Sequence, residues 1–444
     1  MPEAFSTGFI LILLGVIALR LWLSLRQESH VRAHRATVPA AFAERISLAA
    51  HQKAADYTIA RTRLSRVGLA LETLVLLILT YGGGLNALHE FWSAHFEGLA
   101  YGIALIASVV VLASLADIPL DLYRQFRLET RFGFNRMTPR LYLSDRVKQT
   151  LLSALLGLPL LAAVLWLMEI MGSGWWLYVG LLWIGFNLLI LFAYPLWIAP
   201  LFNRFSPLAD GELKARIDAL LERCHFGARE IFVMDGSRRS SHGNAYFTGF
   251  GKARRIVFFD TLLERLSLPQ VEAVLAHELG HFHHKHIIKR TTLIFSLALL
   301  LLALLDQLID APWFYQSLGV ATGNTSMGLL LSGLVLPVIG FPLTPFMSFL
   351  SRRHEFQADA YAARMASAAD LSDALVKLYE DNAATLTPDP IHSLFYDSHP
   401  PASQRIARLR WLAAGNARIN TGGFPDEETH GAASREQQHD PFRK

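Results

Sequence analysis

The fold of this chain is decided first by residues 149–203, QTLLSALLGLPLLAAVLWLMEIMGSGWWLYVGLLWIGFNLLILFAYPLWIAPLFN, which contain neither lysine nor arginine. An α-helix needs about 20 mostly apolar residues to cross a bilayer. This stretch holds two such segments, roughly 150–171 and 175–201, separated by a short loop. The whole chain of 444 residues is 52% hydrophobic and only 18% charged, whereas soluble chains have about 25% charged residues. We therefore expect a protein that folds partly in lipid.

Further apolar segments of sufficient length lie on both sides of this stretch, at about 5–25, 67–88, 98–122, 288–309 and 326–350. The first lacks the charged flank and the small-residue cleavage site of a signal peptide, so we expect it to remain as a span. The sequence therefore predicts an α-helical integral membrane protein with seven transmembrane helices.

The placement of basic residues predicts the orientation of these helices. Residues 67–123 and 291–351 also lack lysine and arginine, whereas 26–66, 124–148 and 204–290 are basic. Lysine and arginine are enriched in cytoplasmic loops. We therefore expect the N-terminus outside and the C-terminus in the cytoplasm. The membrane would be the bacterial inner membrane, or the endoplasmic reticulum membrane in a eukaryote.

Some acidic residues fall within the predicted spans, among them Glu72, Asp117 and Asp121. Lipid cannot solvate such groups, which usually face protein or a water-filled cavity. These three are therefore candidates to line an aqueous chamber.

The charge argues against a nucleic-acid-binding protein, and the cysteine content excludes a fold held by intrachain disulfides. The net charge of +4 is too small to suggest nucleic acid as a partner, and no nucleic-acid-binding motif is present. The single cysteine, Cys224, cannot form an intrachain disulfide. Membrane lipid is an expected partner, and the sequence contains no indication of the oligomeric state.

The residues outside the spans divide the chain into five expected parts. The first is a membrane region over 1–201 with five helices. The second is a protease-like region over 202–286. Its predicted elements are a helix at 213–224, strands at 230–234, 244–251 and 255–259, and a second helix. Ser267 and Gln270 form a capping box at the start of that helix, with Pro269 in its first turn. Two more transmembrane helices occupy 287–351, a further extramembrane region occupies 352–414, and a polar tail without periodicity, expected to be disordered, follows at 415–444.

The helix that starts at Ser267 carries HELGH, residues 277–281. On a helix, positions i and i+4 lie on one face, so His277 and His281 can bind one Zn²⁺. Glu278 adjoins the first ligand and is expected to act as general base on the attacking water.

A catalytic zinc usually has three protein ligands. The nearby His284 shares the face of the two histidines but lies almost two turns from His277, too far for one tetrahedral centre. A better candidate is Glu355, within RRHEFQADAYA at 352–362. Asp359 lies one turn later and would accept a hydrogen bond from a ligand histidine, which fixes the tautomer and orientation of the ring. A solvated helix is the competing interpretation of this pair.

Several motifs occur together in a specific order. They are ETRFGFNRMT at 129–138, YPLWIAPLFNRFSPL at 194–208, NAYFTGFG at 244–251, IVFFDTLL at 256–263, HELGH, RRHEFQADAYA, and SHPPASQRI at 398–406. With these motifs the chain resembles the type I CAAX prenyl proteases, which are integral-membrane zinc metallopeptidases of the gluzincin type. The resemblance covers most of the chain up to about residue 415.

The resemblance implies seven membrane helices around a large water-filled chamber, with a small α/β zinc-protease region on the cytoplasmic side. It implies one zinc ion, with His277, His281 and Glu355 as ligands and Glu278 as the base. It also suggests roles near the substrate for Asn244, His399 and Arg405.

Peptide hydrolysis needs a donor for the tetrahedral oxyanion, and His399 is the first candidate. A structural histidine before Pro400 is the alternative. Residues 244–251, including Asn244 and Tyr246, are expected to bind substrate, because an exposed strand edge can hold an extended peptide by main-chain hydrogen bonds.

Competing functions remain at this stage. A transporter or scaffold with structural histidines fits the basic loops but does not require HELGH with a later EFQAD. A tethered zinc hydrolase of soluble substrates would need only one or two spans. The expected substrate is a peptide or protein, lipidated or membrane-bound. The resemblance points to C-terminal processing of prenylated CAAX proteins, whereas processing or quality control of membrane proteins is expected in a bacterium.

Overall fold

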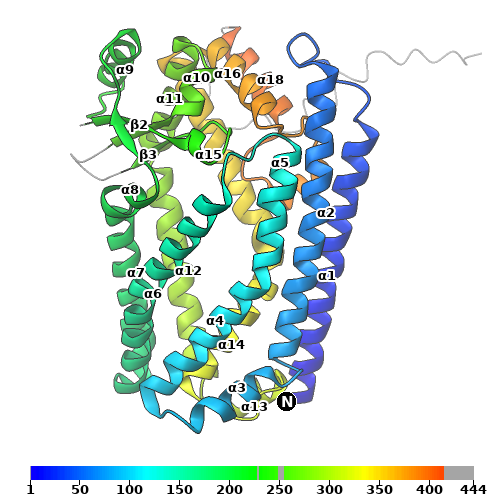
Figure 1. Cartoon of the computed structure of the whole chain (residues 1–444), viewed down its shortest axis with the longest axis vertical. Helices are drawn as coiled ribbons and strands as arrows, with labels where there is room; N and C mark the ends of the chain where they lie inside the picture. The colour runs from blue at the N-terminus through cyan, green and yellow to red at the C-terminus, as the bar shows by residue number, and fades with distance from the viewer. Residues whose placement is uncertain (1, 228–229, 249–254, 415–444) are drawn as a thin grey trace, which may run out of the picture.

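The computed structural model describes residues 2–227, 230–248 and 255–414. Long helices form an open bundle, and a small sheet with shorter helices covers one end of it (Figure 1). The N-terminus lies at the other end, near α3 and α13 (Figure 1).

In the described part of the chain, six helical segments are long and apolar enough to cross a membrane, and one bent pair supplies a seventh. The pair is α2 (Leu48–Leu79) with α3 (Gly84–Ser93), which meet at 51°. This agrees with the seven predicted spans, although the predicted span 67–88 bends in its second half. The break follows Thr80 at three consecutive glycines, Gly82 to Gly84, where Gly83 has a φ of 77°. The other long helices are α1 (Pro2–Ala33), α4 (Gly98–Tyr123), α6 (Pro139–Ile170), α7 (Trp175–Ala193), α12 (His286–Leu308), α14 (Thr325–Gly340) and α15 (Thr344–Met365).

Three of these helices extend well beyond their apolar segments at the end that carries the sheet. α1 continues to Ala33, α2 begins after Ser47, and α6 begins after Thr138. The caps explain the starts: the Ser47 hydroxyl accepts from the Ala50 N–H, and the Thr138 hydroxyl accepts from the Leu141 N–H. Much of the basic sequence between the predicted spans is therefore helical and extends the walls of the bundle.

The last predicted span also differs from the structure. The sequence predicts a span ending near 350 and a separate helix from 352. Instead, α14 ends at Gly340, a short 3₁₀ turn covers Phe341–Leu343, and α15 then runs unbroken across the expected boundary. The prolines explain the positions of these ends, because Pro342 falls in the turn and Pro345 in the first turn of α15, where a missing N–H costs little. Glu355 therefore lies on a helix that continues from the membrane bundle.

The sheet has four strands in the order β1-β2-β4-β3. β1 (Phe205–Pro207) and β3 (Ala245–Thr248) are antiparallel to their neighbours, and β2 (Glu230–Met234) is parallel to β4 (Arg255–Phe259). The predicted strands 230–234 and 255–259 are confirmed. Of the predicted strand 244–251, residues 249–251 lie outside the described part. Among the described residues β3 pairs with β4 alone, and so it forms an edge of the sheet.

The helices around the sheet are α9 (Glu212–Arg223), α10 (Asp260–Arg265), α11 (Leu268–His283), α16 (Ala368–Asp381), α17 (Pro390–Tyr396) and α18 (Ala402–Ala413). α11 begins with the predicted capping box of Ser267 and Gln270. Its apolar face packs into a core that α9, β4, α15, α16 and α18 share. The tail predicted to be disordered, 415–444, lies outside the described residues.

At Gly280, α11 lies very close to the backbone of α15. A Cβ added there would lie 2.9 Å from the Ala358 Cα and 3.1 Å from the Tyr361 Cβ. Only glycine permits this separation, so the last turn of HELGH packs directly on the backbone of the helix that carries Glu355.

Candidate metal centre and chamber

The structure brings His277, His281 and Glu355 together, with one potential ligand atom of each within 4.8 Å of the others. The two histidines come from successive turns of α11, and Glu355 comes from α15. The Nε2 atoms of His277 and His281 are 3.2 Å apart. The Glu355 carboxylate lies 3.5 Å from the first nitrogen and 3.3 Å from the second.

These separations fit a single zinc ion. Two nitrogens bound to a tetrahedral zinc at about 2.0–2.1 Å lie roughly 3.3–3.4 Å apart. In addition, the buried Oε2 of Glu355 makes no hydrogen bond among the described residues, and its nearest partners there are long ion-pair contacts with Arg405 at 3.4 Å and His277 at 3.5 Å. A buried carboxylate oxygen without a hydrogen bond is costly unless it is paired or coordinates a metal. The donor set and its spacing therefore suit zinc.

Asp359 and Arg405 lie directly behind His277. The Nδ1 of His277 is 2.9 Å from Asp359, and Arg405 donates two hydrogen bonds to the same carboxylate, at 2.9 and 2.6 Å. Asp359 is completely buried. Asp359 therefore lies within hydrogen-bond distance of Nδ1 of His277, while Nε2 of that ring is directed at Glu355 and His281.

His281 has its own support, which sequence reasoning did not assign. Its Nδ1 lies 3.0 Å from the Nδ1 of His286, and the Nε2 of His286 lies 2.9 Å from the Gln357 side-chain oxygen. His286 is buried and stacks on His354, with ring centroids 4.0 Å apart. The HFHHKH run offers several histidines, and only the folded chain shows which one contacts a ligand.

The electrostatics of the centre favour positive charge. Burial lowers the pKa of His277, but Asp359 and Glu355 outweigh it and raise the pKa to about 9. Burial raises the pKa of Glu355, but His277 and His281 hold it below its ordinary value. Burial likewise opposes ionisation of Asp359, and Arg405 brings its pKa to about 2. Two ionised carboxylates in a buried site attract a cation.

Two other candidates, Glu278 within HELGH and His284 just after it, lie outside the cluster of three ligand groups. Glu278 is half-buried on α11, adjacent to His277. His284 is not in the ligand cluster; its ring packs beside His286 and Tyr361. Glu355, and not His284, is therefore the third member of the cluster with His277 and His281.

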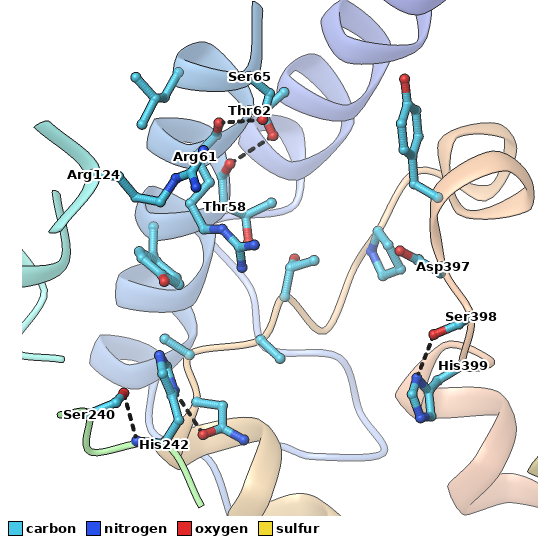
Figure 2. A pocket seen from close by; sticks show the side chains of 18 of the residues that line it. Thr58, Arg61, Thr62, Ser65, Arg124, Ser240, His242, Asp397, Ser398 and His399 are labelled. Carbon is cyan, nitrogen blue, oxygen red and sulfur yellow. Dashed lines mark hydrogen bonds between the residues drawn. The ribbon is translucent and has the colours of Figure 1, made fainter. Parts of the chain in front are cut away.

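A cavity of about 1400 Å³ lies between the bundle and the sheet, and His399 connects its wall to the metal centre, whose three candidate ligands are not themselves among the described lining residues. α2 forms one wall, and the segment Asp397–His399 forms another (Figure 2). The exposed His399 has its Nε2 3.5 Å from the Glu355 carboxylate, and Ser398 Oγ lies 3.0 Å from its Nδ1 (Figure 2). Asn244 and Tyr246 also line this cavity, beside the edge strand β3.

The predicted acidic lining is only partly present. Glu72 lines the cavity, but Asp117 and Asp121 are not among the lining residues in the described part of the chain. Asp121 instead pairs with Arg124 and Arg146. The four-residue spacing of the two aspartates places them on one helix face but does not show which way that face points.

Arg405 is the one candidate whose position differs from its predicted role. The sequence resemblance suggests contact with substrate, but the side chain is 4% exposed, does not line the described cavity wall, and is held by Asp359. Its other guanidinium nitrogen lies 3.4 Å from Glu355. This geometry suits orientation of the ligand shell.

The chamber wall also contains groups that the sequence did not indicate. Thr58, Arg61, Thr62 and Ser65 form a polar face of α2 within a segment expected to be a loop (Figure 2). Below them, His242 is 2.9 Å from the Asn382 side chain and packs on Phe134, and Tyr57 donates a hydrogen bond to Glu129. These contacts join the ETRFGFN motif to the segment that leads into β3.

Comparisons with known proteins agree with this architecture. Residues 27–204 match a family model described as CAAX prenyl protease N-terminal, five membrane helices, and residues 207–413 match peptidase family M48. The CAAX prenyl protease 1 homolog of Arabidopsis thaliana is 35% identical over 316 residues, 70% of this chain and 74% of the relative. CAAX prenyl protease 1 of Saccharomyces cerevisiae is 35% identical over 71% of this chain and 73% of its own length. The crystal structure of S. mikatae Ste24p has a TM-score of 0.84 and 28% identity, over 91% of this chain and 98% of that chain.

Proposed function

Because the chain belongs to the M48 metallopeptidase family and is a zinc-dependent endopeptidase of the membrane, we propose that His277, His281 and Glu355 hold one zinc ion and that the reaction takes place at the wall of the chamber. The observation that carries this proposal is the convergence of three ligand groups, at zinc-compatible spacing, beside His399 and a cavity of about 1400 Å³. Family membership favours hydrolysis over the transporter or scaffold interpretation.

A bound zinc would polarise the scissile carbonyl and lower the pKa of a coordinated water toward 7. Glu278 takes a proton from the attacking water and delivers it to the leaving amine. Asp359 holds His277 at Nδ1, and Arg405 holds Asp359. The ligand rings thereby keep their orientation when substrate binds.

His399 is the proposed donor to the tetrahedral oxyanion. If the Ser398 hydroxyl donates to Nδ1, the ring proton resides on Nε2. That nitrogen lies beside Glu355 on an exposed side chain, so it can reach an oxygen at the metal centre from the chamber. Removing Ser398 should therefore weaken catalysis without affecting the metal, because the tautomer would no longer be fixed.

The substrate is proposed to be an extended peptide that adds to the sheet at β3. β3 is an edge strand, and Asn244 and Tyr246 beside it line the cavity. Main-chain hydrogen bonds to such an edge position a scissile bond with little dependence on sequence. The relatives are named CAAX prenyl proteases, and we propose lipidated or membrane-bound proteins as substrates of this chain.

We further propose that the metal centre faces the cytoplasm. The N-terminus and the metal-bearing helices lie at opposite ends of the bundle (Figure 1). The basic segments 26–66, 124–148 and 204–290 adjoin the end with the metal, which the positive-inside tendency assigns to the cytoplasm.

The central test compares the wild-type protein with Glu278→Gln. The variant should retain one zinc per chain by elemental analysis and lose hydrolysis of fluorogenic peptides, because the base is not a ligand. Glu264→Gln, the same change on an exposed residue of α10, is the matched control and should retain both. Loss of zinc in Glu278→Gln, or retention of full activity, would contradict the assignment. Peptides released from membranes by the wild type but not by Glu278→Gln would identify the natural substrates.

A further inference from the structure

The charged residues that line the described chamber wall are predominantly positive. They comprise two acidic residues, Glu72 and Asp397, and five arginines, Arg20, Arg61, Arg66, Arg124 and Arg239. An excess of one sign within a partly enclosed cavity raises the local concentration of ligands with the opposite charge. The chamber therefore favours an anionic group on its substrate.

Most of these arginines are already bound to carboxylates. Arg20 pairs with Glu72, Arg66 with Glu28, and Arg239 with Asp145. Arg124 lies 3.4 Å from Asp121, which Arg146 also contacts. The pairs of Arg20, Arg66 and Arg239 join separate elements of the wall, whereas Arg124 pairs with a residue three positions before it.

Arg61 differs from the others. No carboxylate of the described residues lies within ion-pair distance of its guanidinium, whose carbon is 5.4 Å from the centre of the Tyr57 ring. The side chain is exposed and points from α2 into the cavity, on the wall facing the segment with His399 (Figure 2). An exposed guanidinium that contacts a tyrosine ring but forms no ion pair within the described residues is a ready partner for a carboxylate, which it can bind through two parallel hydrogen bonds.

The width of the cavity can be compared with the length of a short peptide that extends from His399 toward Arg61. A cavity of about 1400 Å³ would be roughly 14 Å across if spherical, and three extended residues span about 10 Å. A peptide cleaved near its C-terminus would thus present its terminal carboxylate toward the wall opposite His399.

We propose that Arg61 is the residue that binds the free C-terminal carboxylate of the substrate. This inference rests on the proposed peptidase function, and it identifies the C-terminus as the end of the substrate that the chamber recognises. A long internal segment would place no carboxylate at Arg61 and would have to pass through a chamber with limited room.

The experiment uses the full chain carrying Glu278→Gln, and a labelled peptide that the wild type cleaves, with either a free carboxylate or a carboxamide at its C-terminus. Binding is measured by fluorescence anisotropy. A charge-assisted hydrogen-bonded pair is worth about tenfold to a hundredfold in affinity. The acid should bind more tightly than the amide by that factor, and adding Arg61→Gln should abolish the difference by weakening the acid alone.

Two further variants make the result specific. Arg61→Lys should restore part of the preference, because it keeps the charge but not the bidentate geometry. Arg127→Gln removes an exposed arginine that lies outside the lining set, near Arg124 in sequence, and should change neither affinity. Equal binding of acid and amide overturns the carboxylate site, as does an equal weakening of both by Arg61→Gln. Failure of the wild type to cleave any peptide would instead refute the proposed function, whereas equal binding of acid and amide by a peptide that is cleaved overturns the Arg61 site alone.

Discussion

Gly280 provides a direct test of how the two ligand helices are held together. In Gly280→Ala, the new Cβ would meet the Ala358 Cα at 2.9 Å and the Ala358 carbonyl oxygen at 3.0 Å, whereas ordinary contacts are 3.4–4 Å. Both neighbours are backbone atoms and cannot rotate away. α15 must therefore move from α11 by about 0.5 Å, more than twice the roughly 0.2 Å tolerance of metal–ligand distances.

The displacement acts on the metal centre because His277 and His281 are on α11 and Glu355 is on α15. We expect Gly280→Ala to lower zinc affinity at least tenfold, a loss like that from changing a group that orients a ligand. Its effect on folding should be smaller: overpacking costs about 1–3 kcal/mol, and alanine recovers about 1 kcal/mol of helix propensity. Gly280→Val should lower zinc affinity further.

The assay is competition for zinc with a chelator of known affinity, together with thermal unfolding of the zinc-loaded protein. Gly157→Ala in α6 is the control, since no described atom beyond its chain neighbours and the local helix backbone lies within 4 Å of the position that its methyl group would occupy; it should leave zinc affinity unchanged. Wild-type zinc affinity in both Gly280→Ala and Gly280→Val would refute the argument that this glycine sets the ligand spacing.

Three other outcomes are expected. Asp359→Asn should lower zinc affinity about 10- to 100-fold by removing the charge behind His277; an unchanged affinity in the chelator assay would contradict the role of that bond. His399→Ala should keep its zinc and lose about 10²–10³ in kcat with little change in KM. A loss of zinc would make His399 a ligand, and a rise in KM alone would make it a substrate-binding residue. A reporter active only outside the cytoplasm, fused after residue 415, should be silent, and a strong signal would reverse the proposed orientation.

The parts of this molecule that follow from local periodicity were predictable from sequence. The i, i+4 spacing of His277 and His281 places both on one face of α11 wherever that helix packs, and the capping box at Ser267 fixes its start. The spans follow from length and apolar content, because lipid enforces both. The sequence also indicated that Glu355 would lie near the two histidines, because Asp359, one turn later, supplies the matching partner for a histidine; its role as a ligand stays a proposal.

The chamber was not predictable in the same way. Arg61 lies in a basic segment that the charge pattern identifies only as cytoplasmic, and its direction depends on where the extended α2 stands relative to α4 and α17. Arg405 was expected among substrate contacts, but its position behind Asp359 depends on the packing of α18 against α15. Hydropathy and spacing describe one element at a time, whereas these positions arise where distant elements meet.

The connections of the ligand helices show why the metal centre belongs to a membrane fold. α11 passes into the membrane helix α12 through a single left-handed residue, Lys285, with a φ of 56°. His286, the first residue of α12, contacts His281 and reaches across to Gln357 on α15. α15 itself continues from the bundle without a break. Both helices that supply ligands are therefore anchored in the bundle within a few residues of the metal centre. If the metal centre binds zinc as proposed, a rigid attachment of this kind should hold the scissile bond at a fixed depth beside the chamber, and we expect the position of the substrate in the chamber, and not a sequence motif at the cleavage site, to determine which bond is cut.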